Sequence, residues 1–285
     1  FNIMNQEKAF DVVIVGASFS GLTLAMHLSK ELKVLVVDSK PGAGSSVEST
    51  GLITSHTRKE FLTFFDVDQY ITNKISSICV VSPDYDDYFV SSTDEPWIYQ
   101  TDTKALVKAM ADVLPENVTL STKTTFLAVD NPDRPTSVTL LQNGKKLEVR
   151  ARFLVGADGG HSKVAQVCDG LDQTKKFLFG YEQVFFGDVH LGPNPEETIY
   201  HFWFGEFSLG YGGWLSPTEF NGKKAFRVGL AKMMKDRGEA KGLMNYFLKI
   251  LLDRKIITID GDVASLIMFL VAIFLLVGAQ TDPQQ

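Results

Sequence analysis

The chain opens with an apolar run, a glycine-rich turn and a helical stripe that together predict one βαβ unit. Residues 12–15 are apolar and β-branched throughout, which is typical of a parallel strand covered on both faces. A second strand is predicted at residues 33–37, directly before Asp38. Between the two strands, small or apolar residues recur at the 3.6-residue spacing of a helix that lies against a sheet, namely Gly21, Ala25, Leu28 and Leu32.

Later patterns predict further helices and many short strands. One helix is expected at residues 57–70, with Phe61, Leu62, Phe64 and Phe65 facing inward. Asp102 is expected to cap a second helix, whose inward stripe is Leu106, Met110 and Val113 or Leu114. Strands are predicted at residues 75–81, 85–91, 118–120, 125–129, 137–141, 147–150, 177–189, 198–204 and 255–259.

These elements favour an α/β fold with two interleaved domains. A Rossmann-like domain with a parallel sheet is interrupted by a domain built on a mostly antiparallel sheet, and an apolar helix follows at the C-terminal end. The first domain is expected at residues 1–60 and 101–170, the inserted domain at 61–100 and 171–254, and a degenerate end of the first domain at 255–285.

Composition describes a globular protein and argues against nucleic acid as a partner. The 285 residues are 45% hydrophobic and 22% charged, and the net charge of −6 provides no basic field to gather phosphates. Cys79 and Cys168 offer no disulfide framework and no spacing of metal ligands, so no metal site is expected. Each is interpreted as a small buried apolar residue, which favours a reducing compartment.

Residues 263–279 carry no charged side chain and lie at the short limit for a membrane span. Lys249, Arg254 and Lys255 precede this run and no basic residue follows it, so the rule for positively charged loops places the main domain in the cytoplasm. Two interpretations stay open at this point. The run is either a helix that attaches a cytoplasmic domain to a membrane or a buried core helix.

The glycine-rich turn after the first strand has the spacing of a dinucleotide-binding motif, G-x-G-x-x-G, with Ser18 in the middle position. Gly16 permits the tight turn, Gly21 lets the helix approach the strand, and the small residues Ala17 and Ser18 allow a pyrophosphate near the helix N-terminus. Asp38 stands where an acid accepts hydrogen bonds from ribose hydroxyls. A βαβ unit without a nucleotide is the alternative. The loop from Ser39 onward, rich in glycine and serine, is of a kind that wraps a cofactor or crosses between domains.

A second apolar strand runs into a second glycine-rich turn, GADGGHSKVA at residues 156–165. This segment resembles the GADGxxSxVR signature of flavoproteins with the fold of aromatic hydroxylases. The resemblance implies that Asp158 contacts the ribityl chain of FAD, with Gly156 and Gly159 giving its backbone room. Both glycine turns in one chain therefore indicate FAD more than NAD.

Aromatic residues crowd the predicted strands at 177–189 and 198–204, and suit either a wall that faces an apolar ligand or an ordinary β core. The segment at 209–217, LGYGGWLSP, and the segment FRVGLA at 226–231 resemble the Y-G-W-x-F-P and N-V-G-x-G segments of geranylgeranyl reductases. Ser216 and Ala231 depart from that pattern. The candidate substrate-binding residues are Tyr200, Phe202, Trp203, Tyr211, Trp214 and Pro217.

Two further segments depart from the reductase pattern. The early loop Glu48-Ser49-Thr50-Gly51 has no cysteine where such reductases often carry one. Near the C-terminal end, Gly261 and Asp262 resemble the start of the G-D-A-A-G turn that closes the FAD domain, which makes Asp262 a further cofactor candidate. An apolar run follows it in place of a helix bearing glycine and proline.

The resemblance implies an FAD-dependent oxidoreductase that saturates double bonds of isoprenoid chains in membrane lipids or pigments. An external donor, NADPH or ferredoxin, would reduce the flavin, and the protein would bind and orient the substrate. No catalytic acid is assigned, because the histidines at 56, 161, 190 and 201 show no triad or metal-ligand spacing. Two alternatives remain: a flavin-dependent monooxygenase, and a membrane-anchored accessory subunit that keeps the flavoprotein fold without turnover.

Overall fold

The computed structural model describes residues 8–47, 49–171, 177–192, 199–220, 223–261 and 270–275. These residues form two compact units. Unit 1 comprises the described parts of Phe1–Val47 and Thr103–Lys175, and unit 2 those of Glu48–Asp102 and Lys176–Gln285. The first crossing follows residue 47, earlier than the predicted boundary after residue 60. The chain therefore runs twice through each unit.

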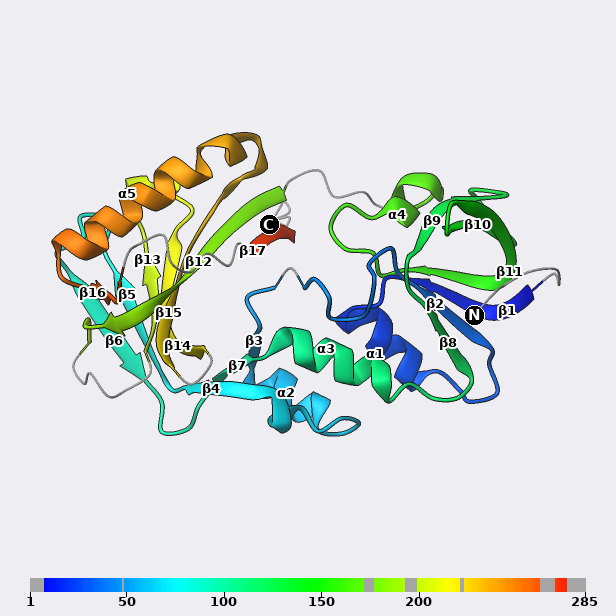
Figure 1. The fold of residues 1–285 in the computed structure, drawn as a ribbon, viewed down its shortest axis with the longest axis horizontal. Helices are drawn as coiled ribbons and strands as arrows, with labels where there is room; N and C mark the ends of the chain where they lie inside the picture. Colours follow the sequence, from blue (N-terminus) through cyan, green and yellow to red (C-terminus); the bar gives the residue numbers. More distant parts are fainter. Residues whose placement is uncertain are drawn as a thin grey trace, which may run out of the picture. The chain divides into compact units, whose positions relative to one another are not determined.

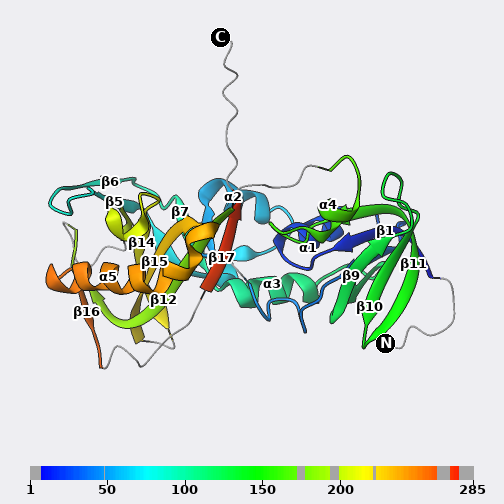
Figure 2. The same ribbon diagram turned by 90° about the horizontal axis from the view of Figure 1, so that it is seen from above.

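Unit 1 is built on one six-stranded sheet in which parallel strands continue into an antiparallel group. Strand β11 is parallel to β1 on one side and antiparallel to β10 on the other, and Figure 2 shows β9, β10 and β11 side by side. In spatial order the strands are β8 (Val118–Ser121), β2 (Val34–Val37), β1 (Lys8–Val15), β11 (Lys145–Gly156), β10 (Ser137–Gln142) and β9 (Thr124–Val129).

Strand β11 is longer than the sequence patterns predict. We expected one strand at residues 147–150 and a separate apolar strand from Phe153, and the structure joins them without a break. The early part of β11 pairs with β10 up to Arg150, and β1 pairs from Val149 onward, so each half has its partner on a different side. The hairpin before it turns at Asn143 and Gly144, which both have positive φ, as a type I′ turn requires.

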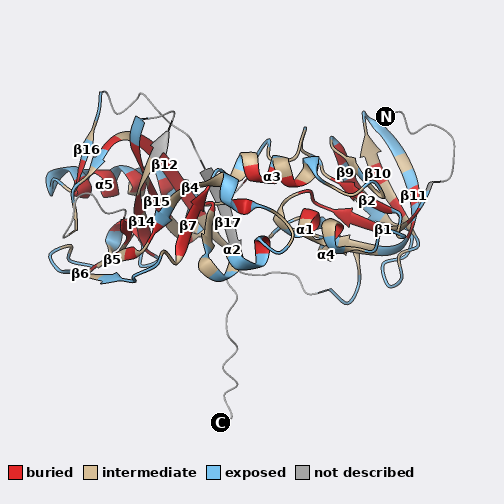
Figure 3. Cartoon of the chain, turned by 90° about the horizontal axis from the view of Figure 1, so that it is seen from below, coloured by how far each residue is buried: buried red, intermediate tan, exposed pale blue. Residues whose placement is uncertain are grey.

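Three helices cover the two faces of this sheet (Figure 1). Helices α1 (Phe19–His27) and α3 (Thr103–Asp112) lie together on one face, and the short helix α4 (Lys163–Val167) lies on the other, against β9 and β11. The predicted stripe of α3 is fully buried at Leu106 and Met110, whereas Val113 is 59% exposed because the helix ends before it. Figure 3 shows the buried stripe of α3 and the buried strand β1 in red.

Unit 2 contains an eight-stranded sheet that is antiparallel except where β13 runs parallel to β5. Strand β12 is paired on one side with β15, and on the other with β16 and β17. The strands are β16 (Ile257–Ile259), β17 (Leu270–Leu275), β12 (Phe177–Val189), β15 (Lys223–Met233), β14 (Gly213–Phe220), β13 (Ile199–Trp203), β5 (Ser77–Val81) and β6 (Tyr88–Ser92).

A small three-stranded sheet and a short helix complete the first part of unit 2. In spatial order the strands are β3 (Leu52–Thr54), β7 (Ile98–Thr101) and β4 (Ile71–Ile75). The helices of this part are α2 (Ser55–Phe61) and the 3-10 helix η1 (Val67–Tyr70). The helix predicted over residues 57–70 is therefore too long. The Thr63 hydroxyl donates to the carbonyl of Glu60 at 2.6 Å, a local bond that competes with helix continuation, and Leu62 is exposed rather than inward.

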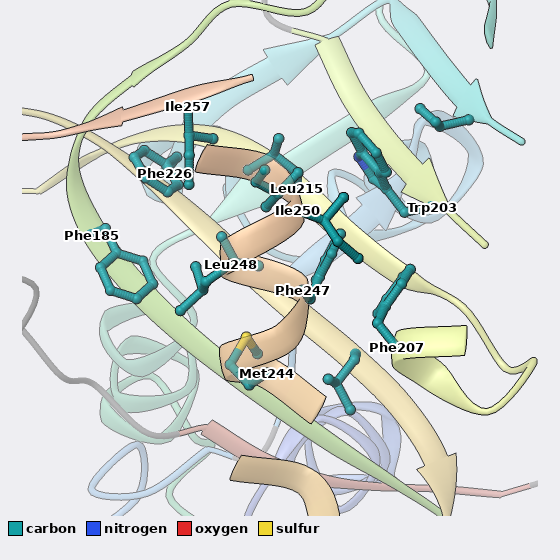
Figure 4. Packing of buried hydrophobic residues seen from close by; sticks show 14 of the residues in the cluster. Phe185, Trp203, Phe207, Leu215, Phe226, Met244, Phe247, Leu248, Ile250 and Ile257 are labelled. Atoms are coloured by element: carbon teal, nitrogen blue, oxygen red, sulfur yellow. The ribbon is translucent and has the colours of Figure 1, made fainter. Parts of the chain in front are cut away.

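Helix α5 (Ala240–Asp253) covers one face of the large sheet and forms its main core. Its inward side chains Met244 and Phe247 pack between strands and the 3-10 helix η2 (Glu206–Ser208), and Phe247 stacks on Phe207 with ring centroids 3.9 Å apart (Figure 4). A third 3-10 helix, η3 (Met234–Glu239), leads from β15 into α5. One face of the sheet is thus closed by α5.

The predicted C-terminal apolar helix is wrong where the structure describes it. Residues 270–275 form β17, antiparallel to β12, and the remainder of 263–279 lies outside the described residues. An apolar run of this kind suits a buried strand as well as a helix, and the free edge of β12 favours the strand. Strands β16 and β17 both join the sheet of unit 2, rather than closing the domain of unit 1. Within the described part of the chain, no helix combines the length and apolar character needed to span a bilayer.

Candidate functional site

Two glycine-rich turns and one acid meet at the carboxyl end of three neighbouring parallel strands in unit 1. Strand β1 lies between β2 and β11, and Val15 is in register with Val37 on one side and Gly156 on the other. The amide of Gly16 donates to the carbonyl of Val37 at 2.8 Å, and the amide of Ala157 donates to that of Val15 at 2.8 Å. Both turns therefore begin at one edge of the sheet, where open α/β sheets bind their ligands.

Gly16 and Gly21 occupy positions where a side chain has no room. A Cβ on Gly16 would lie 2.6 Å from the carbonyl carbon of Ala157, and its φ of +110° lies in the region that L residues rarely adopt. A Cβ on Gly21 would overlap the carbonyl oxygen of Gly16, because α1 crosses close to the turn. The local backbone therefore requires both glycines, Gly16 for the tight turn and Gly21 for the close approach of α1.

Ser18 is the N-cap residue of α1 and has an extended backbone. Its carbonyl accepts the first helical hydrogen bond, from Leu22 at 2.9 Å, but its hydroxyl makes no capping bond. The buried Ala17 lies directly before it. The hydroxyl of Ser18 is therefore not used to cap the helix, and it stands at the positive end of the helix dipole.

The carboxylate of Asp38 is fixed by two backbone amides. Ala17 donates to its Oδ2 at 2.8 Å and Lys40 to its Oδ1 at 2.8 Å, so the acid ties the first turn to the loop after β2. A carboxylate has about four lone-pair sites, so each oxygen retains capacity for a ribose hydroxyl. Ser39, the neighbouring candidate, is exposed. The loop then packs on α3, where a Cβ on Gly44 would overlap the carbonyl oxygen of Lys104.

Asp158 has a structural role that sequence reasoning missed. Its Oδ2 accepts from the amides of Lys163 at 2.6 Å and Val164 at 3.1 Å, and its Oδ1 accepts from the Ser162 hydroxyl at 2.6 Å. The acid thereby satisfies free amides at the start of α4, while the Ser162 hydroxyl caps the amide of Ala165 at 3.0 Å. Serine before a short apolar run is the N-cap signal that was available in the sequence.

The two glycines of the second turn have different surroundings. A Cβ on Gly156 would lie 2.9 Å from the Cβ of Val164, so this glycine lets α4 pack on the end of β11. Gly159 has a φ of +83° and nothing within 4 Å of its missing Cβ, so only its backbone conformation demands glycine. Asp262, the remaining cofactor candidate, lies outside the described residues.

The aromatic candidates of unit 2 divide between the two faces of the large sheet. Tyr200, Phe202 and Trp214 lie on the face opposite α5, with the Tyr200 and Phe202 ring centroids 4.9 Å apart. Trp203 lies on the α5 face, is only 1% exposed and meets Phe247 edge to face. The alternation of side chains along β13 accounts for this difference between neighbours. Trp203 is therefore a core residue.

The other two candidates lie in the turn before β14 and within β14. Tyr211 is largely exposed, in the turn after η2. Pro217 is half-buried in β14, and its carbonyl accepts from the Asn73 side chain at 3.1 Å. That bond ties the large sheet to β4 of the small one.

A buried glutamate and a half-buried arginine, which the sequence did not single out, lie beside Trp214. The indole Nε1 of Trp214 donates to Glu182 Oε2 at 2.6 Å, and Arg227 Nη1 donates to Glu182 Oε1 at 3.2 Å. Burial raises the pKa of Glu182 above its ordinary range, while the positive charge of Arg227 and the two hydrogen bonds oppose the rise. Burial, followed by the nearby charge of Glu182, raises the pKa of Tyr200, which stays protonated at neutral pH.

Two titratable groups on the other face are buried in the core. Burial lowers the pKa of His201 to about 4, and neither ring nitrogen has a hydrogen-bond partner among the described residues. Its register partner on β5 is Cys79, and burial raises the pKa of that thiol to about 11. Cys79 is thus buried and unreactive, as predicted for it. His201 is neutral at physiological pH.

The geometry of unit 1 agrees with a comparison to known families. Residues 9–210 match the FAD binding domain family. The chain belongs to this family. FAD is therefore its cofactor, and the turn at Gly16, the carboxylate of Asp38 and the turn at Asp158 are the described features that fit it.

Curated relatives include both reductases and a monooxygenase. The chain is 30% identical over 176 residues to "FAD-dependent monooxygenase cdmI" of Talaromyces verruculosus, which covers 56% of this chain and 35% of that protein. It is 29% identical over 161 residues to "Digeranylgeranylglycerophospholipid reductase 1" of Methanothermobacter thermautotrophicus, which covers 55% of this chain and 40% of that protein. The matches thus span less than half the length of either relative.

Among solved structures, the fold is similar to that of a geranylgeranyl bacteriochlorophyll reductase-like protein from Thermoplasma acidophilum. The TM-score is 0.74 at 16% identity, and the match covers 94% of this chain and 66% of that one. At this level of identity the likeness concerns the fold alone.

Proposed function

We propose that this chain carries the FAD-binding and substrate-binding parts of an oxidoreductase that saturates carbon–carbon double bonds in isoprenoid chains. The observation that carries the proposal is the aromatic row of Tyr200, Phe202 and Trp214 on the face of the large sheet opposite α5, with Phe202 and Trp214 half-buried, in a chain of the FAD binding domain family. Relatives named as digeranylgeranylglycerophospholipid reductases support the substrate class. The substrate is then a prenyl lipid or pigment.

The residues of unit 1 hold the cofactor in this proposal. The backbone around Gly16, Ala17 and Ser18 receives the pyrophosphate at the start of α1, with Gly21 keeping the helix close. The carboxylate of Asp38, with Ser39 beside it, accepts hydrogen bonds from the ribose hydroxyls.

The second turn is assigned to the ribityl chain. Asp158 holds the turn by capping α4, while Gly156 and Gly159 keep its backbone accessible. When bound and reduced, FAD supplies the hydride that an alkene accepts. An external donor such as NADPH or ferredoxin then reduces the flavin again. The chain binds and orients the cofactor and the substrate, and it excludes water from them.

The residues of unit 2 would bind the apolar chain. Trp214 and Phe202 are half-buried and in register on neighbouring strands, so their rings leave some apolar area accessible. Tyr200 is buried and Tyr211 is exposed. A surface of this kind suits a hydrocarbon, because transfer of apolar area from water is its main source of affinity.

A flavin-dependent monooxygenase is the second candidate, favoured by the relative named "FAD-dependent monooxygenase cdmI". It would use the same cofactor contacts and differ in the fate of the reduced flavin, which would react with oxygen. The two functions therefore predict different products from one purified protein.

The test is anaerobic and single-turnover. The full chain is titrated with FAD, reduced with dithionite, and mixed with a geranylgeranyl lipid while flavin absorption and product mass are followed. Reoxidation with gain of two hydrogens by the lipid supports the reductase. A parallel reaction that admits oxygen tests the alternative, and a hydroxylated product formed only there favours the monooxygenase. Bound FAD with neither product leaves an accessory subunit without turnover. Gly21→Val is the variant expected not to bind FAD. If the native chain also fails to bind FAD, the proposal is contradicted.

A further inference from the structure

Three neighbouring strands of unit 2 bring Glu182, Gly229 and Trp214 into one row. Glu182 on β12 is in register with Gly229 on β15, and Gly229 is in register with Trp214 on β14. A Cβ on Gly229 would lie 2.5 Å from the indole nitrogen of Trp214. The absent side chain at Gly229 therefore lets the indole lie across β15 and reach the carboxylate of Glu182 on the next strand.

This carboxylate is engaged on both oxygens and shielded from solvent. Glu182 is 3% exposed, its Oε2 accepts from Trp214 and its Oε1 from Arg227. Arg227 in turn donates to the carbonyl of Thr50 at 3.4 Å, in the turn that precedes β3. One acid thus fixes an aromatic ring and, through Arg227, a loop on the same face of the sheet.

Stability alone does not require this arrangement. Removing two charges from water is costly, and a buried ion pair replaced by well-packed apolar residues is often as stable or more so. The core of unit 2 lies on the opposite face, under α5, where Phe226, Val228 and Leu230 of the same strand β15 are fully buried. The Glu182 cluster therefore lies on the face opposite α5, outside that main core, where Glu182 is buried and Trp214 and Arg227 are half-buried.

The indole held by Glu182 belongs to the aromatic row. Trp214 is in register with Phe202 on β13, and the ring of Phe202 contacts that of Tyr200. Tyr200 packs on Ile75 and Ile98 of the small sheet and is buried there, whereas Trp214 and Phe202 are half-buried. The carboxylate consequently fixes the indole at the more accessible end of the row.

We propose that Glu182 is a positioning residue that holds the Trp214 indole across Gly229 and thereby determines which apolar chains the aromatic row accepts. The inference rests on the proposed function in one respect, namely that this face binds a hydrocarbon. The ligand class is a long unsaturated or branched hydrocarbon chain. Its branching methyl groups meet a wall whose shape depends on the indole, and the hydrogen bond to Glu182 fixes the edge of that ring.

The first experiment observes Trp214 directly, without turnover. The emission of Trp214 is obtained as the difference between the native chain and Trp214→Phe, and a brominated fatty alcohol, bromododecanol, serves as a contact quencher. In Glu182→Leu we expect emission at longer wavelength and an apparent affinity for bromododecanol lower by roughly tenfold, the discrimination that a misfitted methylene or two produces in an apolar pocket. Glu182→Gln retains an acceptor for the indole N–H and should keep both properties close to native.

A matched control separates positioning from a general loss of structure. Glu206 is an exposed acid in η2, and Glu206→Gln should change neither emission nor quenching. If Glu182→Leu leaves the Trp214 spectrum and the quenching unchanged, the inference is overturned. It is equally overturned if bromododecanol fails to quench Trp214 in the native chain, since the row then faces no hydrocarbon.

Turnover gives the second readout where the proposed function holds. Glu182→Leu should raise KM for a geranylgeranyl substrate more than it lowers kcat, and should reduce the preference for that chain over a shorter prenyl chain by roughly tenfold. A uniform loss of kcat for all chains would contradict a role in chain selection. If the native chain binds no FAD or reduces no alkene, the proposed function fails while the fluorescence result still decides the role of Glu182.

Discussion

Replacement of His201 should remove a large part of the acid sensitivity of unit 2. The imidazole is 1% exposed, and burial lowers its pKa from the ordinary 6.5 to about 4. Because the folded pKa lies below the unfolded one, the unfolded chain takes up the proton first as the pH falls. Above the unfolded pKa the ring is neutral in both states, and the free energy of unfolding keeps its full value. It falls between about pH 6.5 and about pH 4, where the unfolded chain binds the proton and the folded chain does not.

The size of the effect follows from these two pKa values. With a folded pKa of about 4 and an unfolded pKa of about 6.5, His201 lowers the free energy of unfolding by roughly 2 kcal/mol between pH 7 and about pH 4.5. His201→Leu places an apolar side chain between Cys79 and Leu215, its register partners on the two neighbouring strands. This variant should lose less stability over that pH range by about the same amount.

The assay is urea unfolding followed by tryptophan emission at a series of pH values. The three tryptophans, Trp97, Trp203 and Trp214, all belong to unit 2, so the signal reports that unit alone. The control is His190→Leu, which removes an exposed histidine at the end of β12 and should follow the native pH dependence. Parallel pH profiles for the native chain and His201→Leu would refute the argument.

Three further substitutions test the turns and the aromatic row. Gly16→Ala should destabilise unit 1 by roughly 1–3 kcal/mol and weaken FAD binding in a fluorescence titration, whereas Gly42→Ala, whose Cβ meets nothing within 4 Å, should not; equal melting temperatures would contradict this. Asp158→Ala should cost about 1–2 kcal/mol and speed amide exchange in the first turn of α4, and unchanged exchange would rule out the cap. Gly229→Ala should displace the indole of Trp214 and shift its emission to longer wavelength, so an unaltered spectrum would show that the ring does not lie across β15.

Local patterns were sufficient for the nucleotide-binding turn because its determinants lie close together in sequence. The strand, the turn and the helix at residues 8–27 are specified by apolar runs and by glycines that the backbone geometry demands. The hairpin at Asn143 and Gly144 was predictable for the same reason. In contrast, the single strand β11 depends on which partner each half finds, and such pairing is not visible in a local pattern.

The aromatic surface was only half predictable. Alternation along β13 separates Tyr200 and Phe202 from Trp203, so a period-two reading would have removed Trp203 from the candidates. The Glu182 cluster could not be predicted from a local pattern, because its members come from three strands. Trp214 and Arg227 lie 32 and 45 residues from Glu182 along the chain. The apolar run at 270–275 was misassigned because hydropathy alone does not distinguish a buried strand from a helix.

The acids of unit 1 show why a sequence motif describes only part of a site. Asp38 and Asp158 were selected as acceptors for sugar hydroxyls, and in the fold each also receives backbone amides from a neighbouring segment. Those bonds orient both carboxylates without any contribution from a ligand. A group that is already oriented loses little freedom on binding, so under the proposed function the same amides that stabilise the two turns would also lower the entropic cost of binding FAD. Under the proposed function, fold stability and cofactor affinity are therefore coupled at these two residues, and a change at either acid should alter both.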